Sequence, residues 1–259
     1  MAEVGSYPDG AFCWVDLGTT DVPGASAFYR ELFGWDIEDL PAGEGTYTMC
    51  RLRGKTVAGI HHHDEDEGIS WSSSISVGDV DATAATAQDL GAAVLVEPTD
   101  IPGAGRTSAI RDPGGAVVGL WQPAGHGGAG LVNEVGTWTW NELVAPDLDR
   151  ATAFYGGLFG WTAQEVPAPM ARVSFAMGDL LIGGGHAPGP GEHDAPRWDV
   201  SFRVADVERA AGHAGRLGGR VLLPPTDIPI GRFTILSDPI GAVFTAAEFE
   251  APFRGVDGS

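Results

Sequence analysis

The sequence predicts an α+β fold of four βαβββ units, arranged as two tandem modules with mixed sheets. Two observations carry this prediction: strand-like and helix-like segments recur in that order, and the whole pattern occurs twice with a period of about 126 residues. Such a period is too long for a solenoid, so each copy is expected to be a module with its own core, and duplication favours a site between the copies. The paired landmarks are Trp14-Val15-Asp16-Leu17 and Trp140-Asn141-Glu142-Leu143, Ala27-Phe28-Tyr29 and Ala153-Phe154-Tyr155, Leu32-Phe33-Gly34-Trp35 and Leu158-Phe159-Gly160-Trp161, Pro98-Thr99-Asp100-Ile101-Pro102 and Pro225-Thr226-Asp227-Ile228-Pro229, and Asp112-Pro113-Gly114-Gly115 and Asp238-Pro239-Ile240-Gly241.

The first copy opens with an alternating segment typical of a half-buried strand, in which Phe12, Trp14 and Asp16 share one face. A helix follows, because Asp21 can cap it and Gly34 can end it. The remaining expected elements are strands at 46–52, 56–60, 71–77, 93–97, 106–111 and 116–121 and a helix at 80–90.

The second copy is expected to repeat this order over 138–249, with helices at 147–158 and 206–217. Runs rich in glycine, proline or charge predict loops at 61–68 and 183–197, and the glycines of 124–130 predict a flexible linker. The expected domains are therefore 1–124, a linker at 125–135, and 136–259.

Composition limits the possible partners. The formal charge of −20 disfavours nucleic acid and anionic membranes, and no apolar run reaches the ~20 residues of a membrane span. Cys13 and Cys50 are too few for a disulfide framework. The first residues lack the plan of a signal peptide, so we expect a cytoplasmic protein. A duplicated chain can pair its modules internally, so we expect a monomer or a homodimer.

These repeated motifs make the chain similar to the vicinal oxygen chelate superfamily of glyoxalases, bleomycin-binding proteins, fosfomycin-resistance enzymes and extradiol dioxygenases. The motifs are a strand leading to an aspartate, Ala-Phe-Tyr, Leu-Phe-Gly-Trp and a closing Asp-Pro-x-Gly, and they cover about 11–123 and 137–249. The resemblance implies cupped sheets. It leaves the activity open, because the superfamily includes lyases, transferases, dioxygenases and non-catalytic drug-binding proteins.

The resemblance also allows the metal positions of the family to be tested. Three positions per module usually carry His, Gln or Glu, and a first-row metal needs about three or four such donors. Only Asp199 is a good ligand, so we predict that the metal site has been lost and that no metal or other cofactor is bound. The six positions here are Trp14, Ser72 and Gly119 in the first module, and Trp140, Asp199 and Thr245 in the second.

The polar faces of the strands predict a small-molecule pocket, because aromatic planes give contact area and a few polar groups fix orientation. Trp35 and Trp161, which follow helix ends, are expected to be structural. The predicted ligand-binding residues are Trp14, Trp121, Trp140, Ser72, Ser74, Asp199, Arg203, Arg106 and Arg232.

Asp16 and Glu142 are the predicted catalytic pair. Each lies two residues beyond its tryptophan on the same face, and partial desolvation there would raise the pKa of a carboxyl group and suit it to acid–base chemistry. The alternative is that each only accepts hydrogen bonds or pairs with an arginine such as Arg203. Arg106 and Arg232 similarly either bind an anionic ligand group or only pair with Asp100 and Asp227.

The run His61-His62-His63-Asp64 suggests a metal site at first sight, but consecutive loop residues point in different directions and the second copy lacks the run. We therefore expect a surface role for it.

The sequence thus predicts a protein that binds a small planar or aromatic metabolite, and it leaves open whether the protein also transforms that metabolite by metal-independent acid–base chemistry. A non-catalytic drug-sequestering protein, a metal-dependent lyase or dioxygenase, and an interaction module without ligand are the alternatives. The composition has a single lysine, Lys55, with abundant Ala, Gly and Arg, as in GC-rich genomes. Similar duplicated proteins are frequent in actinobacteria, which implies a ligand from secondary metabolism.

Overall fold

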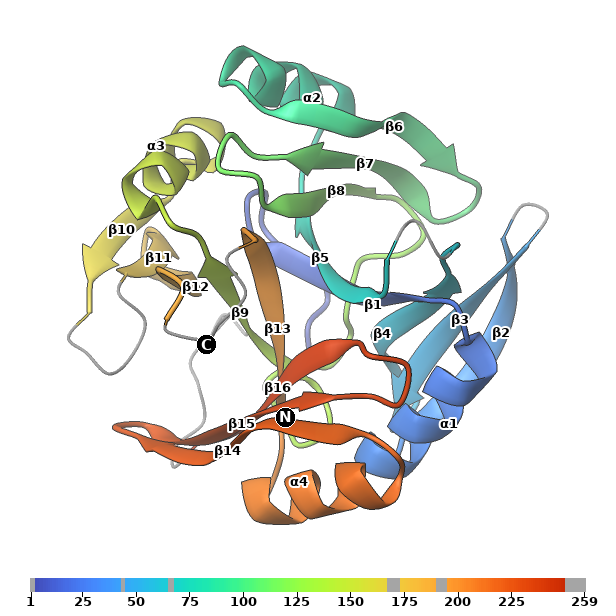
Figure 1. Ribbon diagram of the computed structural model, residues 1–259. Coiled ribbons are helices and arrows are strands. Elements are labelled where there is room, and N and C mark those ends of the chain that lie inside the picture. Colours follow the sequence, from blue (N-terminus) through green and yellow to red (C-terminus); the bar gives the residue numbers. More distant parts are fainter. Residues whose placement is uncertain (1–2, 43–44, 65–67, 167–172, 190–194, 250–259) are drawn as a thin grey trace.

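Two eight-stranded mixed sheets, one for each copy, make up the protein. The computed structural model describes residues 3–42, 45–64, 68–166, 173–189 and 195–249. The strand orders are β2-β3-β4-β1-β5-β8-β7-β6 and β10-β11-β12-β9-β13-β16-β15-β14, so the two sheets have one topology (Figure 1). Each sheet joins two βαβββ units through its central antiparallel pair, β1 with β5 or β9 with β13. The predicted α+β architecture is confirmed.

The elements follow the predicted order closely. Aspartates at 21, 79, 147 and 206 accept a hydrogen bond from the first turn of each helix, and left-handed Gly34 and Gly160 end two helices. The first copy contains β1 (Phe12–Thr19), α1 (Val22–Phe33), β2 (Asp36–Ala42), β3 (Gly45–Leu52), β4 (Lys55–His62), β5 (Ser70–Ser76), α2 (Val80–Asp89), β6 (Ala93–Ile101), β7 (Gly105–Arg111) and β8 (Val117–Pro123). The second contains β9 (Trp138–Val144), α3 (Leu148–Phe159), β10 (Thr162–Glu165), β11 (Val173–Met177), β12 (Leu180–His186), β13 (Arg197–Arg203), α4 (Val207–Arg216), β14 (Arg220–Ile228), β15 (Gly231–Ser237) and β16 (Val243–Phe249).

Several boundaries differ from the sequence-based expectation. The edge strands β2 and β10 were not predicted, because their residues are mostly exposed and show little alternation. Gly183 to His186 belong to β12, and His61 and His62 end β4, so the predicted loops at these residues are wrong. The rest of those runs includes 65–67 and 190–194, which lie outside the described residues.

A bulge also separates Phe12 from Trp14 on β1. It places Phe12 in the core against Trp161 and Trp198 of the other module, at ring-centroid distances of 5.7 and 5.0 Å. The expectation that Phe12 shares a face with Trp14 is therefore wrong, because a bulge inserts one residue and reverses the alternation beyond it.

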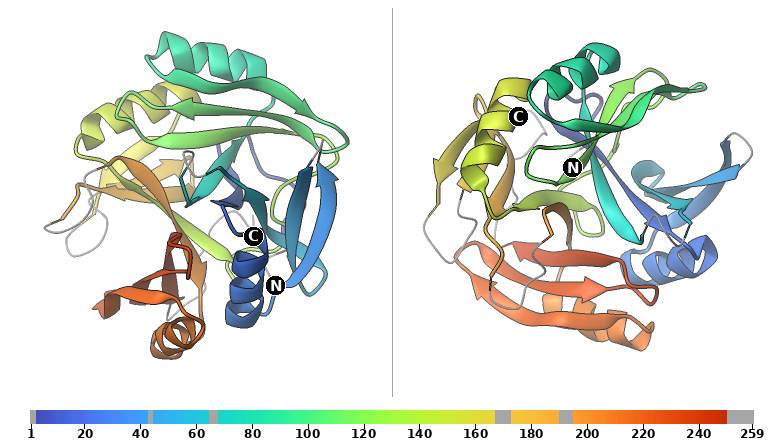
Figure 2. Two further views of the ribbon diagram at one scale, coloured as in Figure 1. Left: turned by 45° about the vertical axis from the view of Figure 1, so that its right-hand side comes forward. Right: turned by 45° about the horizontal axis from the view of Figure 1, so that its top comes forward.

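The two modules share one core. In Figures 1 and 2, α1 lies beside α4 and α2 beside α3, and β5 contacts β13 between the sheets. The buried apolar residues of both copies form a single cluster, rather than the separate core expected for each copy. Phe202 of β13, for example, packs on Phe33, Trp35 and Trp71 of the first copy.

The repeated motifs form this junction through matching hydrogen bonds. The hydroxyl of Tyr29 donates to Asp238 at 3.3 Å, and that of Tyr155 donates to Asp112 at 2.9 Å. Burial raises the pKa of both tyrosines well above the usual value, so each hydroxyl remains a donor. Trp71 and Trp198 donate in turn to Tyr29 and Tyr155. Ala-Phe-Tyr and Asp-Pro-x-Gly are thus structural contacts between the copies.

The glycine-rich segment after β8 is held in place rather than free. The amides of Ala129 and Gly130 donate to the carbonyls of Cys13 and Thr56, and the hydroxyl of Tyr7 donates to Ala129 O at 2.7 Å. Gly128 has φ of +108°, and a Cβ there would lie 2.4 Å from the Cys13 carbonyl oxygen. These glycines therefore permit close approach to β1, which composition alone cannot distinguish from a flexible linker.

Candidate functional site

Four predicted site residues of the first module lie together on one face of its central strands. Asp16 pairs with Ser72, and Trp14 with Ser74, across the antiparallel β1 and β5. A Cβ at Gly119 of β8 would lie 2.3 Å from the hydroxyl of Ser74. The Ser74 side chain therefore packs over Gly119 of the neighbouring strand. Cys13, Val15 and Leu17 occupy the opposite, fully buried face. The expected division into a polar and an apolar face therefore applies from Cys13 to Leu17.

Asp16 is the centre of a hydrogen-bonded group. The Ser72 hydroxyl donates to its Oδ1, and the Tyr47 hydroxyl of β3 donates to its Oδ2 at 3.4 Å. Trp14 Nε1 donates to Tyr47 at 2.8 Å. Burial, followed by the nearby Asp16 charge, raises the pKa of Tyr47 well above the usual value, so this phenol remains protonated. Sequence reasoning missed Tyr47, because only the pairing of β3 with β4 brings it to this face.

His61 joins this group from β4. Its Nδ1 lies 4.0 Å from Asp16 Oδ2, and its ring stacks on Tyr47 at a centroid distance of 6.0 Å. The histidine run is therefore not confined to a surface loop: His61 is two residues beyond Gly59, the parallel partner of Asp16. The parallel register of β4 with β1 is the signal that places His61 here, and the histidine run itself does not contain it.

His126 reaches the same face from the segment after β8. Its ring contacts Trp14 edge-on at 4.5 Å and Trp121 at 5.8 Å, and the Trp121 indole donates to its carbonyl oxygen at 2.9 Å. Burial lowers the pKa of His126, and the nearby Arg51 charge acts in the same direction. A linker assignment gave no signal for this residue. His61, Tyr47, Trp14, His126 and Trp121 form a continuous line of rings, named here the aromatic row.

The second module repeats part of this arrangement. Trp140 Nε1 donates to Glu142 Oε2 at 2.8 Å, and His186 Nδ1 lies 3.1 Å from Glu142 Oε1. Register makes His186 the counterpart of His61, because Gly184 pairs with Glu142 as Gly59 pairs with Asp16. Each predicted carboxylate therefore has an imidazole from the parallel neighbouring strand. The sequence offset between the copies does not reveal this match, because their loops differ in length.

The predicted arginines lie elsewhere. Arg106 pairs with Asp100 at 2.5 Å and Asp81 at 2.9 Å, and Arg232 pairs with Asp227 and Glu208, each at 2.6 Å. Both agree with the structural alternative, in which each ties a hairpin to a helix. Arg203 donates to the Asn133 carbonyl, whereas Asp199 pairs with Arg197 at 2.9 Å. We therefore leave these arginines out of the site proposed below.

The residues do not fit the metal of the fold family. Trp14, Ser72 and Gly119 supply no carboxylate or imidazole. In the second module Trp140 and Thr245 are both register partners of Ser201, whereas Asp199 lies opposite Glu142 and pairs with Arg197. Within the described ranges, no group of three His, Cys, Asp or Glu side chains is placed to hold a metal ion. One carboxylate paired with an arginine is not a donor set for a first-row metal.

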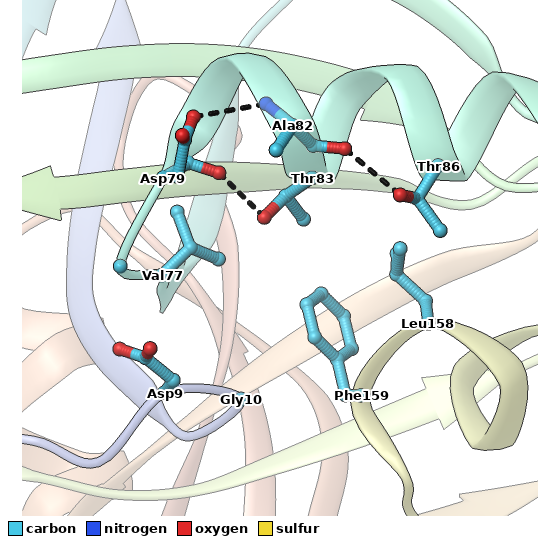
Figure 3. Close-up of a pocket in the computed structure, with 10 residues that line it drawn as sticks. Asp9, Gly10, Val77, Asp79, Ala82, Thr83, Thr86, Leu158 and Phe159 are labelled. Carbon is cyan, nitrogen blue, oxygen red and sulfur yellow. Dashed lines mark hydrogen bonds between the residues drawn. The ribbon is translucent and has the colours of Figure 1, made fainter.

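An open pocket of about 440 Å³ lies between the copies, beside α2 and α3. Figure 3 shows Leu158 and Phe159 facing Thr86, with Asp9 and Asp79 toward the other end. Asp79 is already the N-cap of α2. None of the predicted site residues lines this pocket, so the site expected between the copies is not where the candidate side chains gather.

The fold and this face define a member of the glyoxalase, bleomycin-resistance and dioxygenase class, and the sequence comparisons agree. Residues 12–120 match the model of the Glyoxalase/Bleomycin resistance protein/Dioxygenase superfamily, and residues 140–247 match a Glyoxalase-like domain. The chain belongs to this superfamily, as a tandem two-domain member.

Its relatives include proteins of similar length. "Putative glyoxylase CFP32" from Mycobacterium tuberculosis is 42% identical over 95% of this chain and 97% of that protein. The anthracycline biosynthesis proteins DauV of Streptomyces sp. (strain C5) and DnrV of Streptomyces peucetius are 31% and 30% identical, over 98% and 97% of this chain and 98% of each of theirs.

Solved structures share the fold. The Mn(II)-bound glyoxalase from Novosphingobium aromaticivorans has a TM-score of 0.63 at 16% identity, over 95% of this chain and 86% of that one. The 2,3-dioxygenase LapB from Pseudomonas sp. KL28 has a TM-score of 0.62 at 13% identity, over 97% of this chain and 96% of that one.

No helix in the described part of the chain is long and apolar enough to cross a membrane.

Proposed function

We propose that the polar face of the first module binds a small planar aromatic metabolite and moves a proton on it without a metal. The aromatic row beside Asp16 is the observation that carries the proposal. Trp14, His126 and Trp121 offer ring edges and faces, while Asp16, Ser72 and Tyr47 form a connected polar group at one end of the row. Aromatic contact area with a few fixed polar groups is the usual composition of a small-molecule site.

Unpaired polar atoms support a ligand with hydroxyl groups. His61 Nδ1 and His126 Nε2 are buried, and neither has a hydrogen-bond partner among the described residues. They lie on opposite sides of the Tyr47–Trp14 hydrogen bond, since His61 stacks on Tyr47 and His126 contacts Trp14. An unmet hydrogen bond costs about 1–3 kcal/mol. A flat ligand with polar hydrogens at two edges would relieve both.

The relatives fit this ligand class. Two are named for anthracycline biosynthesis, which supports a polycyclic aromatic metabolite as the ligand and a role in secondary metabolism. Metal-dependent lyase or dioxygenase chemistry finds no fitting donor set on this face. A drug-sequestering protein would use the same face without the proton transfer. For an enzyme, substitution of Asp16 should lower turnover more than binding. For a sequestering protein, only binding can change.

The binding step is testable with anthraflavic acid, a flat dihydroxyanthraquinone whose hydroxyls lie at opposite ends and away from its carbonyls, and anthraquinone, its hydroxyl-free analogue. We expect anthraflavic acid to bind the native protein at one site and anthraquinone to bind at least about tenfold more weakly, because each hydrogen bond contributes about 1 kcal/mol. His126→Ala should weaken anthraflavic acid binding on the order of tenfold, through loss of one hydrogen bond and one ring contact. Calorimetric titration measures both effects.

His62→Ala is the matched control, because His62 is exposed, lies on the same strand as His61 and pairs with Asp64. It should bind anthraflavic acid as the native protein does. Equal affinity for the two probes, or no loss in His126→Ala, would contradict the proposed ligand contacts.

A further inference from the structure

Three groups in the first module form a chain of hydrogen bonds that ends on the polar face. His63 Nδ1 lies 3.1 Å from the Gly68 carbonyl oxygen, and His63 Nε2 lies 3.0 Å from His61 Nε2. The rings of His61 and His63 meet edge to face at 4.7 Å. The other ring nitrogen of His61, Nδ1, is the one near Asp16.

The hydrogens of this chain follow from what each atom can do. A carbonyl oxygen only accepts, so His63 Nδ1 must carry the hydrogen, and the Nε2 of a neutral His63 is then an acceptor. His61 Nε2 must therefore carry the hydrogen that joins the two rings. In a neutral His61, Nδ1 is left with a free lone pair.

We infer that His61 is the proton acceptor of the proposed site, fixed in this role by His63, with Asp16 as its counter-charge. This assignment rests on the proposed function and refines it: Asp16 stabilises the protonated imidazole instead of taking the proton. His61 touches the ligand, and His63 is a positioning residue. The carbonyl oxygen of Gly68 is the acceptor at the far end of this chain of hydrogen bonds.

The chemical step is an isomerisation that needs no oxidant. A C–H or O–H bond of the ligand breaks, its electron pair stays on the ligand, and the proton forms a bond to His61 Nδ1. The resulting imidazolium faces Asp16 Oδ2 across 4.0 Å. Return of the same proton to another atom of the ligand gives a tautomer and restores neutral His61. The substrate class is therefore a hydroxylated aromatic or enolisable ketone.

Gly18 of β1 leaves space for the ring of His63. A Cβ there would lie 2.3 Å from two atoms of the His63 ring, which is closer than any real contact. The second module has Val144 at the corresponding position of β9, opposite His186. His186 Nδ1 instead faces a carboxylate oxygen of Glu142, which only accepts, so that nitrogen carries a hydrogen. The two related imidazoles should have opposite tautomers.

Long-range proton–nitrogen NMR of the full chain with ¹⁵N-histidine tests this directly, without a ligand. In the spectrum recorded at about pH 8, we expect hydrogen on Nε2 of His61 and on Nδ1 of His63 and His186. Single His→Gln variants assign the signals. A His61 with its hydrogen on Nδ1 would overturn the inference.

Two variants test the part of His63. His63→Ala removes the ring, and Gly18→Ala displaces it while leaving the imidazole in the chain. Both should turn His61 into a mixture of tautomers, whereas His62→Ala should leave its signals unchanged. If Gly18→Ala does not fold, His63→Ala still decides the point. Unchanged His61 signals in His63→Ala would show that His63 does not fix the His61 tautomer. Failure of anthraflavic acid to bind would refute the proposed function alone.

Discussion

Asp112→Ala is expected to lower the free energy of unfolding by about 2–6 kcal/mol. Asp112 is 4% exposed and accepts hydrogen bonds from Tyr155 of the other module and from the amides of Gly115 and Ala116. Alanine would leave two buried donors unpaired, the Tyr155 hydroxyl and the Ala116 amide, at about 1–3 kcal/mol each, while the Gly115 amide keeps its bond to the main-chain carbonyl at 112. Urea unfolding followed by tryptophan fluorescence measures the effect as a lower midpoint with an unchanged slope.

Asp100→Ala is the matched control for this prediction. Asp100 is exposed, and its partner Arg106 keeps a second contact with Asp81. Little shift in the midpoint is expected, because exposed ion pairs contribute little to stability. If Asp112→Ala behaved like Asp100→Ala, the Asp-Pro-x-Gly turn would not be the junction described here.

The two copies are expected not to fold apart. Expressed alone, fragments 1–132 and 133–259 should each lack a cooperative unfolding transition. Phe12, Phe202 and Phe244 make ring contacts across the junction, and each loses about 2–3 kcal/mol of burial when the copies separate. That sum is comparable to the 5–15 kcal/mol that stabilises a typical domain.

Co-expression of the two fragments supplies the control. It should restore a soluble complex with one molecule of each, since the break lies in a segment that remains packed on β1 and β4. Circular dichroism during heating measures the transition in each sample. A fragment that unfolds cooperatively alone near the temperature of the intact chain would show that each copy has an independent core.

Much of the fold was predictable because its signals are local. Aspartate caps and glycine ends mark the helices, and the alternation of β1 and β5 places Trp14, Asp16 and Ser72 on one face. The shared core was not predictable, since the apolar face of a strand looks the same whether a helix or another module covers it. The edge strands β2 and β10 lacked the required apolar pattern.

The site was only partly predictable for a related reason. Asp16 and Glu142 were found from their own strands, but their imidazole neighbours depend on the parallel pairing of β4 with β1 and of β12 with β9. Tyr47 requires a further strand pairing, and His126 requires the path of a segment without regular structure. Such pairings depend on register, which a single sequence specifies weakly where loop lengths differ.

The central claim is that a planar ligand binds on the aromatic row of the first module. The most direct measurement is the indole region of the proton–nitrogen NMR spectrum during a titration with anthraflavic acid, in which each of the eight tryptophans gives one signal. We expect the Trp14 and Trp121 signals to move together and saturate, while Trp35 and Trp161 of the core stay in place. Saturation with Trp14 and Trp121 unmoved would place the ligand elsewhere and contradict the account.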